Sequence, residues 1–228
     1  MENRIYLDKV PRSLKMKKIG AGHNGKCYLT NKKQVYKEYY NKGIDDEITD
    51  RLTKLNYEGF TFPKQLVIVD GVFKGYIKDY VEGQTIDSLD RTKTNIGDFL
   101  EALKAFETQL MEFSYDTELD VCDLNLHNLV YTNDNRIVNI DTDIIHPFIY
   151  PITNPYFENL KELSSSLQKI FLDGEFKSRE LQQLQNECLV KGFMRPSTFI
   201  SRALYRLDGY ADINTIDDYE QGLVLLRK

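Results

Sequence analysis

The stretch Asp123-Leu-Asn-Leu-His-Asn128, followed by Val138-Asn-Ile-Asp141-Thr-Asp143, decides the fold that we expect for this chain. A carboxylate is followed five positions later by a carboxamide, and a second carboxylate comes thirteen positions further on, after a short apolar segment. Phosphoryl transfer uses such a set, because one carboxylate orients the attacking hydroxyl while an amide oxygen and another carboxylate hold magnesium. Turn chemistry is the alternative, since Asp and Asn side chains also bond their own backbone in loops.

The second carboxylate has a close neighbour. Asp141 and Asp143 lie two positions apart at the end of a predicted strand. Two carboxylates at this spacing repel each other unless a cation or a donor lies between them. A metal site is therefore one interpretation, and a polar strand terminus is the other.

A glycine-rich turn lies upstream, in Gly20-Ala-Gly22-His-Asn-Gly25, between predicted strands 17–22 and 25–30. Glycines allow the backbone to approach phosphate groups and to present amide N–H groups. The residues after the turn are strand-like, which argues against a dinucleotide-binding fold, where the glycines open a helix. A plain hairpin turn is the alternative.

A lysine lies in the next predicted strand, 34–40. Alternation places Val35, Lys37 and Tyr39 on one face of that strand. An inward lysine is unfavourable unless an anion meets it, so Lys37 is a candidate phosphate-binding residue. An edge-strand lysine that faces water is the alternative.

An amphipathic helix is predicted over 44–56, because Ile44, Ile48, Leu52 and Leu55 recur at helical spacing. We expect a carboxylate of this helix to hold the Lys37 amine. Glu47 is the first choice and Asp45 the second. Either could instead be an acidic residue favoured by the helix dipole.

The remaining pattern separates a strand-rich part, 1–82, from a mainly helical part, 83–228. Strands 66–69 and 72–79 surround Asp70-Gly71, a favoured hairpin dipeptide. In the second part, strands 130–131 and 137–140 surround a polar turn. The predicted helices cover 96–113, 156–172, 177–191, 196–207 and 214–226.

Composition limits the class of protein. The chain has 228 residues, 41% of them hydrophobic, and a net charge of −5, so it shows no basic footprint for nucleic acid. It contains no apolar run of membrane-spanning length and no signal-peptide pattern. Cys27, Cys122 and Cys188 are widely spaced, which favours reduced thiols and a cytoplasmic location over disulfides or a zinc site.

The order of these parts over 17–145 resembles the protein-kinase-like superfamily. The resemblance implies an α+β, two-lobed fold with an antiparallel-sheet N-lobe and a mainly helical, shortened C-lobe. It also implies ATP and Mg²⁺ as cofactors, and transfer of the γ-phosphoryl group to a hydroxyl acceptor on a protein or a small molecule.

The resemblance also implies roles for individual residues. The phosphates would be held by Lys37 and the glycine turn, Gly20, Gly22 and Gly25, with Glu47 holding the lysine. The adenine edge would meet the backbone of Asp79, Tyr80 and Val81. The catalytic loop would supply Asp123 and Asn125, and the metal ligands would be Asn128, Asp141 and Asp143.

Several residues depart from the family pattern. Val121-Cys122 replaces the His-Arg pair before the catalytic aspartate, and Asn125 stands where most protein kinases have lysine. Lys78 occupies a position that is usually bulky and apolar. Asp141-Thr-Asp143 replaces Asp-Phe-Gly, which resembles atypical bacterial serine/threonine kinases and the aminoglycoside and choline kinases. A pseudokinase that acts as a binding module, a small-molecule kinase and an unrelated α+β protein therefore stay open as alternatives.

Overall fold

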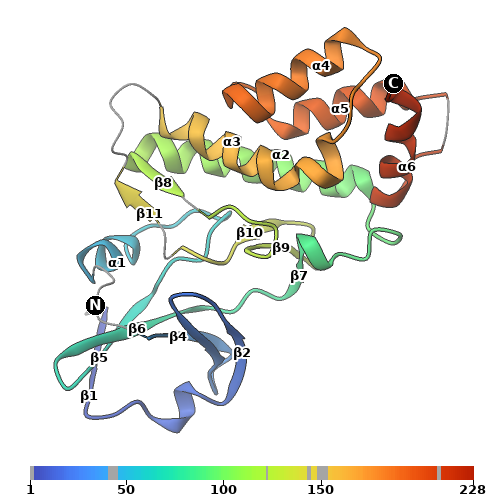
Figure 1. Ribbon diagram of the computed structural model, residues 1–228. Coiled ribbons are helices and arrows are strands. Elements are labelled where there is room, and N and C mark those ends of the chain that lie inside the picture. The colour runs from blue at the N-terminus through green and yellow to red at the C-terminus, as the bar shows by residue number, and fades with distance from the viewer. Residues whose placement is uncertain (1–2, 41–45, 122, 143–144, 148–153, 210–211) are drawn as a thin grey trace. The chain divides into compact units, whose positions relative to one another are not determined.

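The chain divides into two compact units, Met1–Val81 and Glu82–Lys228, and the boundary expected from the sequence lies between residues 82 and 83. The computed structural model describes residues 3–40, 46–121, 123–142, 145–147, 154–209 and 212–228 (Figure 1). Within these ranges the protein is mixed α/β, with a six-stranded sheet in the first unit and mostly helices in the second.

The first unit is built on the six-stranded sheet, in the order β1-β5-β6-β4-β3-β2. Its strands are β1 (Arg4–Leu7), β2 (Lys17–Ala21), β3 (Gly25–Leu29), β4 (Gln34–Tyr39), β5 (Gln65–Val69) and β6 (Val72–Asp79). The five strands predicted here are confirmed to within one residue at each end. The predicted helix is shorter than expected: α1 covers Asp46–Leu52, and residues 41–45 lie outside the described ranges.

The turn between β5 and β6 follows from its sequence. Asp70 has φ 49° and Gly71 has φ 73°, both in the left-handed region. A two-residue hairpin turn of this kind matches the twist of the flanking strands. Gly71 adopts this conformation without a steric penalty, and Asp tolerates it better than most residues.

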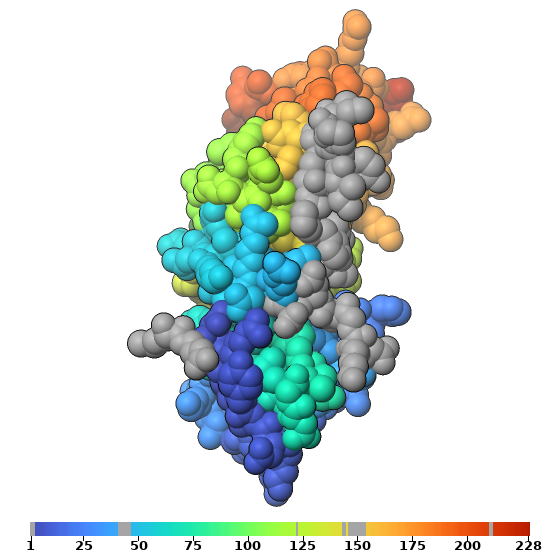
Figure 2. All heavy atoms as spheres, turned by 90° about the vertical axis from the view of Figure 1, so that its left-hand side faces the viewer, coloured from blue at the N-terminus to red at the C-terminus, as the bar shows by residue number. Residues whose placement is uncertain are grey.

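One strand of this sheet was missed. β1 pairs with β5 in parallel, in the register Arg4 to Leu66 and Leu7 to Val69. The expectation of an antiparallel sheet is therefore confirmed for the pairs among β2–β6 and wrong for the pair of β1 with β5. Figure 2 shows the dark-blue β1 segment at the surface, beside the teal β5–β6 hairpin. A parallel partner far away in the sequence leaves no local turn signal, so short-range patterns could not reveal it.

The strand β4 is central and is covered on both faces. Tyr36 packs with Val67 and Ile77 in the core on one face. Val35, Lys37 and Tyr39 are buried on the other face, which agrees with the alternation expected from the sequence. A lysine on a face that water does not reach is the first feature that connects this fold with a site.

The second unit is organised around one long helix. Its α-helices are α2 (Ile96–Thr117), α3 (Pro155–Leu167), α4 (Arg179–Asn186), α5 (Pro196–Leu207) and α6 (Ile216–Leu226). The helices α3 and α4 each continue into a π-helical turn, Gln168–Leu172 and Glu187–Lys191. All five predicted helical segments are confirmed, and α2 runs four residues further than expected.

The central helix carries most of the core of this unit. Phe99, Phe106 and Phe113 recur every seven residues on α2 and are fully buried with Leu103 and Leu110. Burial of each such side chain contributes roughly 1.5–3 kcal/mol. Because α3 and α5 pack on α2, this helix holds the elements that carry the loops described below.

Short strands frame those loops. β7 (Gly83–Thr85), β9 (Leu129–Thr132) and β10 (Ile137–Asn139) form one small sheet, and β8 (Leu119–Val121) pairs with β11 (Ile145–Pro147). The β9–β10 hairpin was predicted, whereas the three-residue strands β7, β8 and β11 were not. The segment 123–128 lies between β8 and β9, and Asp141 follows β10.

Candidate functional site

The glycine turn joins β2 to β3. Gly22 N–H donates to the Gly25 carbonyl at 3.0 Å and closes the turn. A Cβ on Gly25 would lie 2.2 Å from the Glu38 carbonyl oxygen, whereas Gly20 and Gly22 have open space around them. Close packing therefore accounts for the presence of glycine only at position 25. The other two glycines leave exposed backbone that a ligand can approach.

The predicted phosphate-binding lysine is buried in the sheet of the first unit. Lys37 is 6% exposed and lies between its register partners Cys27 and Tyr76. Lys78 is buried on the same face, with its Nζ 5.7 Å from the centre of the Tyr76 ring. Two lysine side chains are therefore buried on this face, and buried ammonium groups are stable only where anions or hydrogen-bond acceptors meet them.

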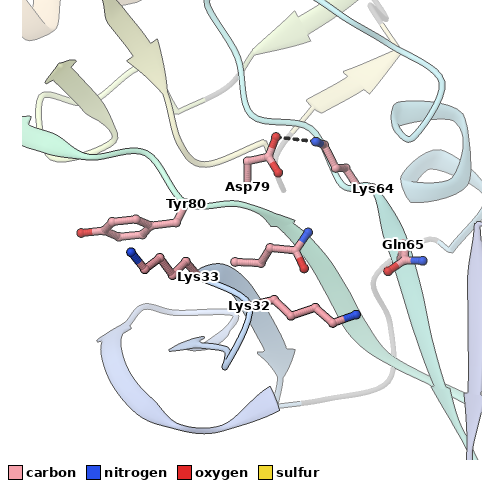
Figure 3. A pocket seen from close by; sticks show the side chains of 7 residues that line it. Lys32, Lys33, Lys64, Gln65, Asp79 and Tyr80 are labelled. Atoms are coloured by element: carbon pink, nitrogen blue, oxygen red, sulfur yellow. Dashed lines mark ion pairs between the residues drawn. The ribbon is translucent and has the colours of Figure 1, made fainter. Parts of the chain in front are cut away.

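The other residues expected to bind the nucleotide are more exposed. Glu47 lies in the first turn of α1 with an exposed side chain, and Asp45 lies outside the described residues. Asp79 is exposed and forms an ion pair with Lys64 at 2.5 Å, at the edge of an open pocket that Tyr80 also lines (Figure 3). Val81 ends the first unit.

In the second unit, the structure brings three of the expected residues together in one loop. Asn125 Nδ2 donates to Asp123 Oδ1, and Asn128 Nδ2 donates to Asp123 Oδ2 at 2.9 Å. The Asn128 amide N–H also donates to the Asn125 carbonyl at 2.9 Å. The Asp123 carboxylate is therefore held in one orientation by two side-chain amides.

The expected metal ligands are tied to the same loop. Ile140 N–H donates to the Asn128 carbonyl at 2.8 Å, and Asp141 N–H donates to Asn139 Oδ1 at 3.0 Å. Asn128 uses its amide nitrogen for Asp123, so its side-chain oxygen remains available as a ligand. An amide oxygen and a carboxylate suit magnesium, which prefers oxygen ligands.

Two of the three expected metal ligands, Asn128 and Asp141, lie in the described part of the chain. Asp143, the third expected ligand, lies outside the described residues. Within the described ranges, no group of three or more His, Cys, Asp or Glu side chains could hold a metal ion. A magnesium ion here would therefore depend on Asn128, Asp141 and oxygen ligands from a bound phosphate.

The helix α3 anchors the backbone on both sides of Asp123. The Asn159 side chain accepts from Val121 N–H at 2.8 Å and donates to Ser114 Oγ on α2 at 2.9 Å. Asn159 is fully buried, so this pair of bonds satisfies polar groups that no water reaches. The loop is thereby joined to the core of the second unit.

A second residue of α3 reaches the loop. Glu162 Oε1 accepts from Leu124 N–H at 3.2 Å. Burial, together with the nearby carboxylates Asp120 and Asp123, raises the pKa of Glu162 to about 7, against the lowering effect of the Leu124 bond. Glu162 therefore brings a carboxyl group that titrates near neutral pH next to the expected catalytic residue.

Sequence reasoning missed both α3 residues. Their signal was weak: Asn159 and Glu162 lie three positions apart, hence on one face of the helix, close to the buried Leu160 and Leu163. A polar pair beside an apolar stripe suggests a buried partner, but it does not name that partner.

Comparisons with other proteins complete the description of the site. Among the described helices, none is both long enough and apolar enough to cross a membrane. The chain matches no model of a known protein family and no curated protein.

Proposed function

We propose that this chain is a magnesium-dependent phosphotransferase of the protein-kinase-like type, which transfers the γ-phosphoryl group of ATP to a hydroxyl group. One observation carries the proposal: Asp123 is held by the amides of Asn125 and Asn128, and Asp141 is tied to the same loop through Ile140. Such a constellation matches the needs of phosphoryl transfer, which is mainly positioning and charge stabilisation.

Each residue has a role in this proposal. Asp123 orients the acceptor hydroxyl and accepts its proton. Asn128 and Asp141 hold magnesium, which when bound would offset the negative charge of the phosphates. Lys37 and the exposed backbone of the glycine turn hold the phosphate groups, because a cation and amide N–H groups favour anions. The acceptor is proposed to be an alcohol of a protein or a small molecule.

A second function is favoured by Asn125. Its amide donates to Asp123 Oδ1, while Asn128 donates to Oδ2, so both carboxylate oxygens already accept a hydrogen bond. An acceptor hydroxyl has to share these oxygens with the amides. A module that binds nucleotide without transferring phosphate is therefore the second candidate.

Phosphate release or self-phosphorylation with MgATP decides between the two. We expect slow turnover by the wild-type chain, and a loss of roughly 10²–10⁴-fold in Asp123→Ala, the range typical of a general base. Asp134→Ala is the matched control, because Asp134 is an exposed carboxylate of the same unit that pairs with Arg136. Its rate should equal that of the wild type.

Asn125→Lys sharpens this test. The substitution replaces the amide that binds Asp123 by a cation of the kind that touches the γ-phosphate in most protein kinases, so we expect a faster reaction. Nucleotide binding combined with equal turnover in wild type and Asp123→Ala would overturn the transferase and leave the binding module.

A further inference from the structure

An open pocket of about 700 Å³ lies in the first unit, at the ends of β4, β5 and β6 (Figure 3). Three lysines line it, Lys32, Lys33 and Lys64, together with the carboxylate Asp79 and the phenol of Tyr80. Its volume lies in the range of small-molecule sites in proteins.

The pocket opens on the sheet face opposite Lys37. Gln34, another lining residue, is the register partner of Asp79. Side chains alternate along a strand, so Gln34 points away from the face that carries Val35 and Lys37. The pocket is therefore separate from the face on which the phosphate-binding role of Lys37 was proposed.

The lining carries an excess of positive charge. Asp79 is the one carboxylate against three ammonium groups, and it is paired with Lys64 at 2.5 Å. Within the described part of the chain, neither Lys32 nor Lys33 forms an ion pair. No carboxylate among the described residues is paired with either of these two lysines at the pocket.

Hydrogen bonds of Thr30 hold the turn that carries these two lysines. The buried Thr30 accepts at Oγ1 from the amides of Lys32 and Gln34, each at 3.2 Å. Its own amide donates to the Gln34 carbonyl at 2.8 Å. A turn fixed in this way presents its side chains at a defined edge of the pocket, which lowers the ordering cost of binding.

Lys33 is also unusual for its conformation. Its φ of 56° lies in the left-handed region, which favours glycine and asparagine over lysine. Lys33 therefore places a positive charge at a position whose backbone conformation favours glycine or asparagine. Sites that break a local rule in this way are often functional.

We infer that this pocket binds a small anion with several negative charges, of the diphosphate class. Lys32 and Lys33 meet its charged oxygens, and Lys64 joins them by exchanging its Asp79 partner for the anion. Tyr80 offers a hydroxyl donor and a half-exposed ring beside them. This inference does not depend on the proposed phosphotransferase function.

Calorimetric titration of the full chain with inorganic pyrophosphate, without divalent metal, tests the pocket. We expect wild-type binding that weakens at least about tenfold in Lys33→Asn, because a charge-assisted contact is lost. Asparagine keeps the turn, since it tolerates the left-handed region. Asp79→Asn should bind several-fold more tightly, because the only negative charge of the lining is removed and Lys64 is released.

A matched control removes one lysine elsewhere. Lys9 is exposed, belongs to the same unit and does not line the pocket, so Lys9→Asn should keep the wild-type affinity within about twofold, apart from a weak screened effect. No binding by the wild type, or equal affinity of wild type and Lys33→Asn, would overturn the inference. Tighter binding of ADP than of pyrophosphate, if it is retained in Lys37→Ala and lost in Lys33→Asn, would assign the pocket to a diphosphate carried by a nucleotide.

Comparison of Lys33→Asn with Lys37→Ala distinguishes anion binding in the pocket from nucleotide binding at the proposed active site. Lys37→Ala should retain pyrophosphate affinity and lose stabilisation by MgATP, while Lys33→Asn should do the reverse. Loss of pyrophosphate binding in Lys37→Ala would overturn the separate pocket. Loss of MgATP stabilisation in Lys33→Asn alone would instead overturn the role of Lys37.

Discussion

Two buried tyrosines differ in one hydrogen bond. Tyr36 and Tyr219 are both fully buried, but Tyr219 Oη donates to the Phe171 carbonyl at 3.0 Å, whereas Tyr36 Oη has no partner among the described residues. An unpaired buried hydroxyl costs about 1–3 kcal/mol. We therefore expect Tyr36→Phe to leave the free energy of unfolding unchanged or raise it by about 1 kcal/mol.

Tyr219→Phe is the matched comparison. It removes the same atom from an equally buried ring but leaves a carbonyl unpaired, so we expect a loss of about 1–2 kcal/mol. Urea denaturation of both variants measures the difference. Equal losses in the two variants would contradict this account of Tyr36.

A buried carboxyl group makes stability depend on pH. Glu107 on α2 is fully buried and accepts from the amide and the hydroxyl of Ser197, at 2.9 and 2.5 Å. Burial raises its pKa from 4.5 to about 7, against the opposing effects of the Ser197 bonds, Arg195 and Lys104. A folded-state pKa above the unfolded value stabilises the protein fully below about pH 4.5.

That stabilisation is lost as the pH rises from about 4.5 through 7. At about 1.4 kcal/mol for each pH unit between the two pKa values, the loss attributable to Glu107 is about 3 kcal/mol. In Glu107→Gln this part of the pH dependence should vanish. Urea denaturation between pH 4.5 and 8 checks it, and parallel curves for variant and wild type would refute it.

The hydrogen bonds of Asn159 join helix α3 to the loop that carries Asp123. Asn159→Ala leaves the buried Val121 amide without its partner, while the Ser114 hydroxyl keeps its bond to the Leu110 carbonyl, so we expect a loss of about 1–3 kcal/mol in stability. Turnover should also fall, because the loop that carries Asp123 is less firmly held. Ser165→Ala is the control, since Ser165 is exposed on the same helix. It should change stability by less than about 0.5 kcal/mol.

Local sequence patterns predicted the elements whose stabilising contacts lie within a few residues along the chain. Helix α2 was predicted from the spacing of its apolar residues, and the β5–β6 hairpin from Asp70-Gly71. β1 was missed because its partner Leu66 lies far along the chain. The three-residue strands β7, β8 and β11 are too short to show any period.

The same distinction holds for the site. Asp123, Asn125 and Asn128 are close in sequence, so one loop brings them together. Glu162 meets Leu124 across 38 positions, and Asn159 meets Val121 across the same separation. Only packing of α3 on the core creates these contacts. The pocket beside the ion pair of Asp79 with Lys64 likewise depends on the pairing of β4 with β6.

Ligand-dependent stability tests the proposal on the whole molecule. ATP with Mg²⁺ should raise the melting temperature, because a ligand at about 100 times its dissociation constant adds about 2.7 kcal/mol. A thermal shift assay with ATP and Mg²⁺ together, and with each alone, measures this. The absence of any shift at millimolar MgATP would exclude both the transferase and the nucleotide-binding module.

Two variants distinguish the metal-binding role of Asp141 from the acceptor-binding role of Asp123 in the same assay. Asp141→Asn should reduce the MgATP shift, because a hard cation loses an anionic ligand. Asp123→Asn should keep most of the shift, since Asp123 is assigned to the acceptor. If both variants lose the shift equally, this division of roles is wrong.

The parallel pairing of β1 with β5 has a consequence for biosynthesis. Arg4 leaves the ribosome long before Leu66, its register partner, so the sheet of the first unit closes late. Loop closure over such a separation is slow compared with hairpin formation. Until β1 has docked, the apolar strand Gln65–Val69 has an open edge, which another unfinished chain can pair with. Removal of the residues that form β1, or a substitution that weakens β1, should therefore lead to aggregation through β5.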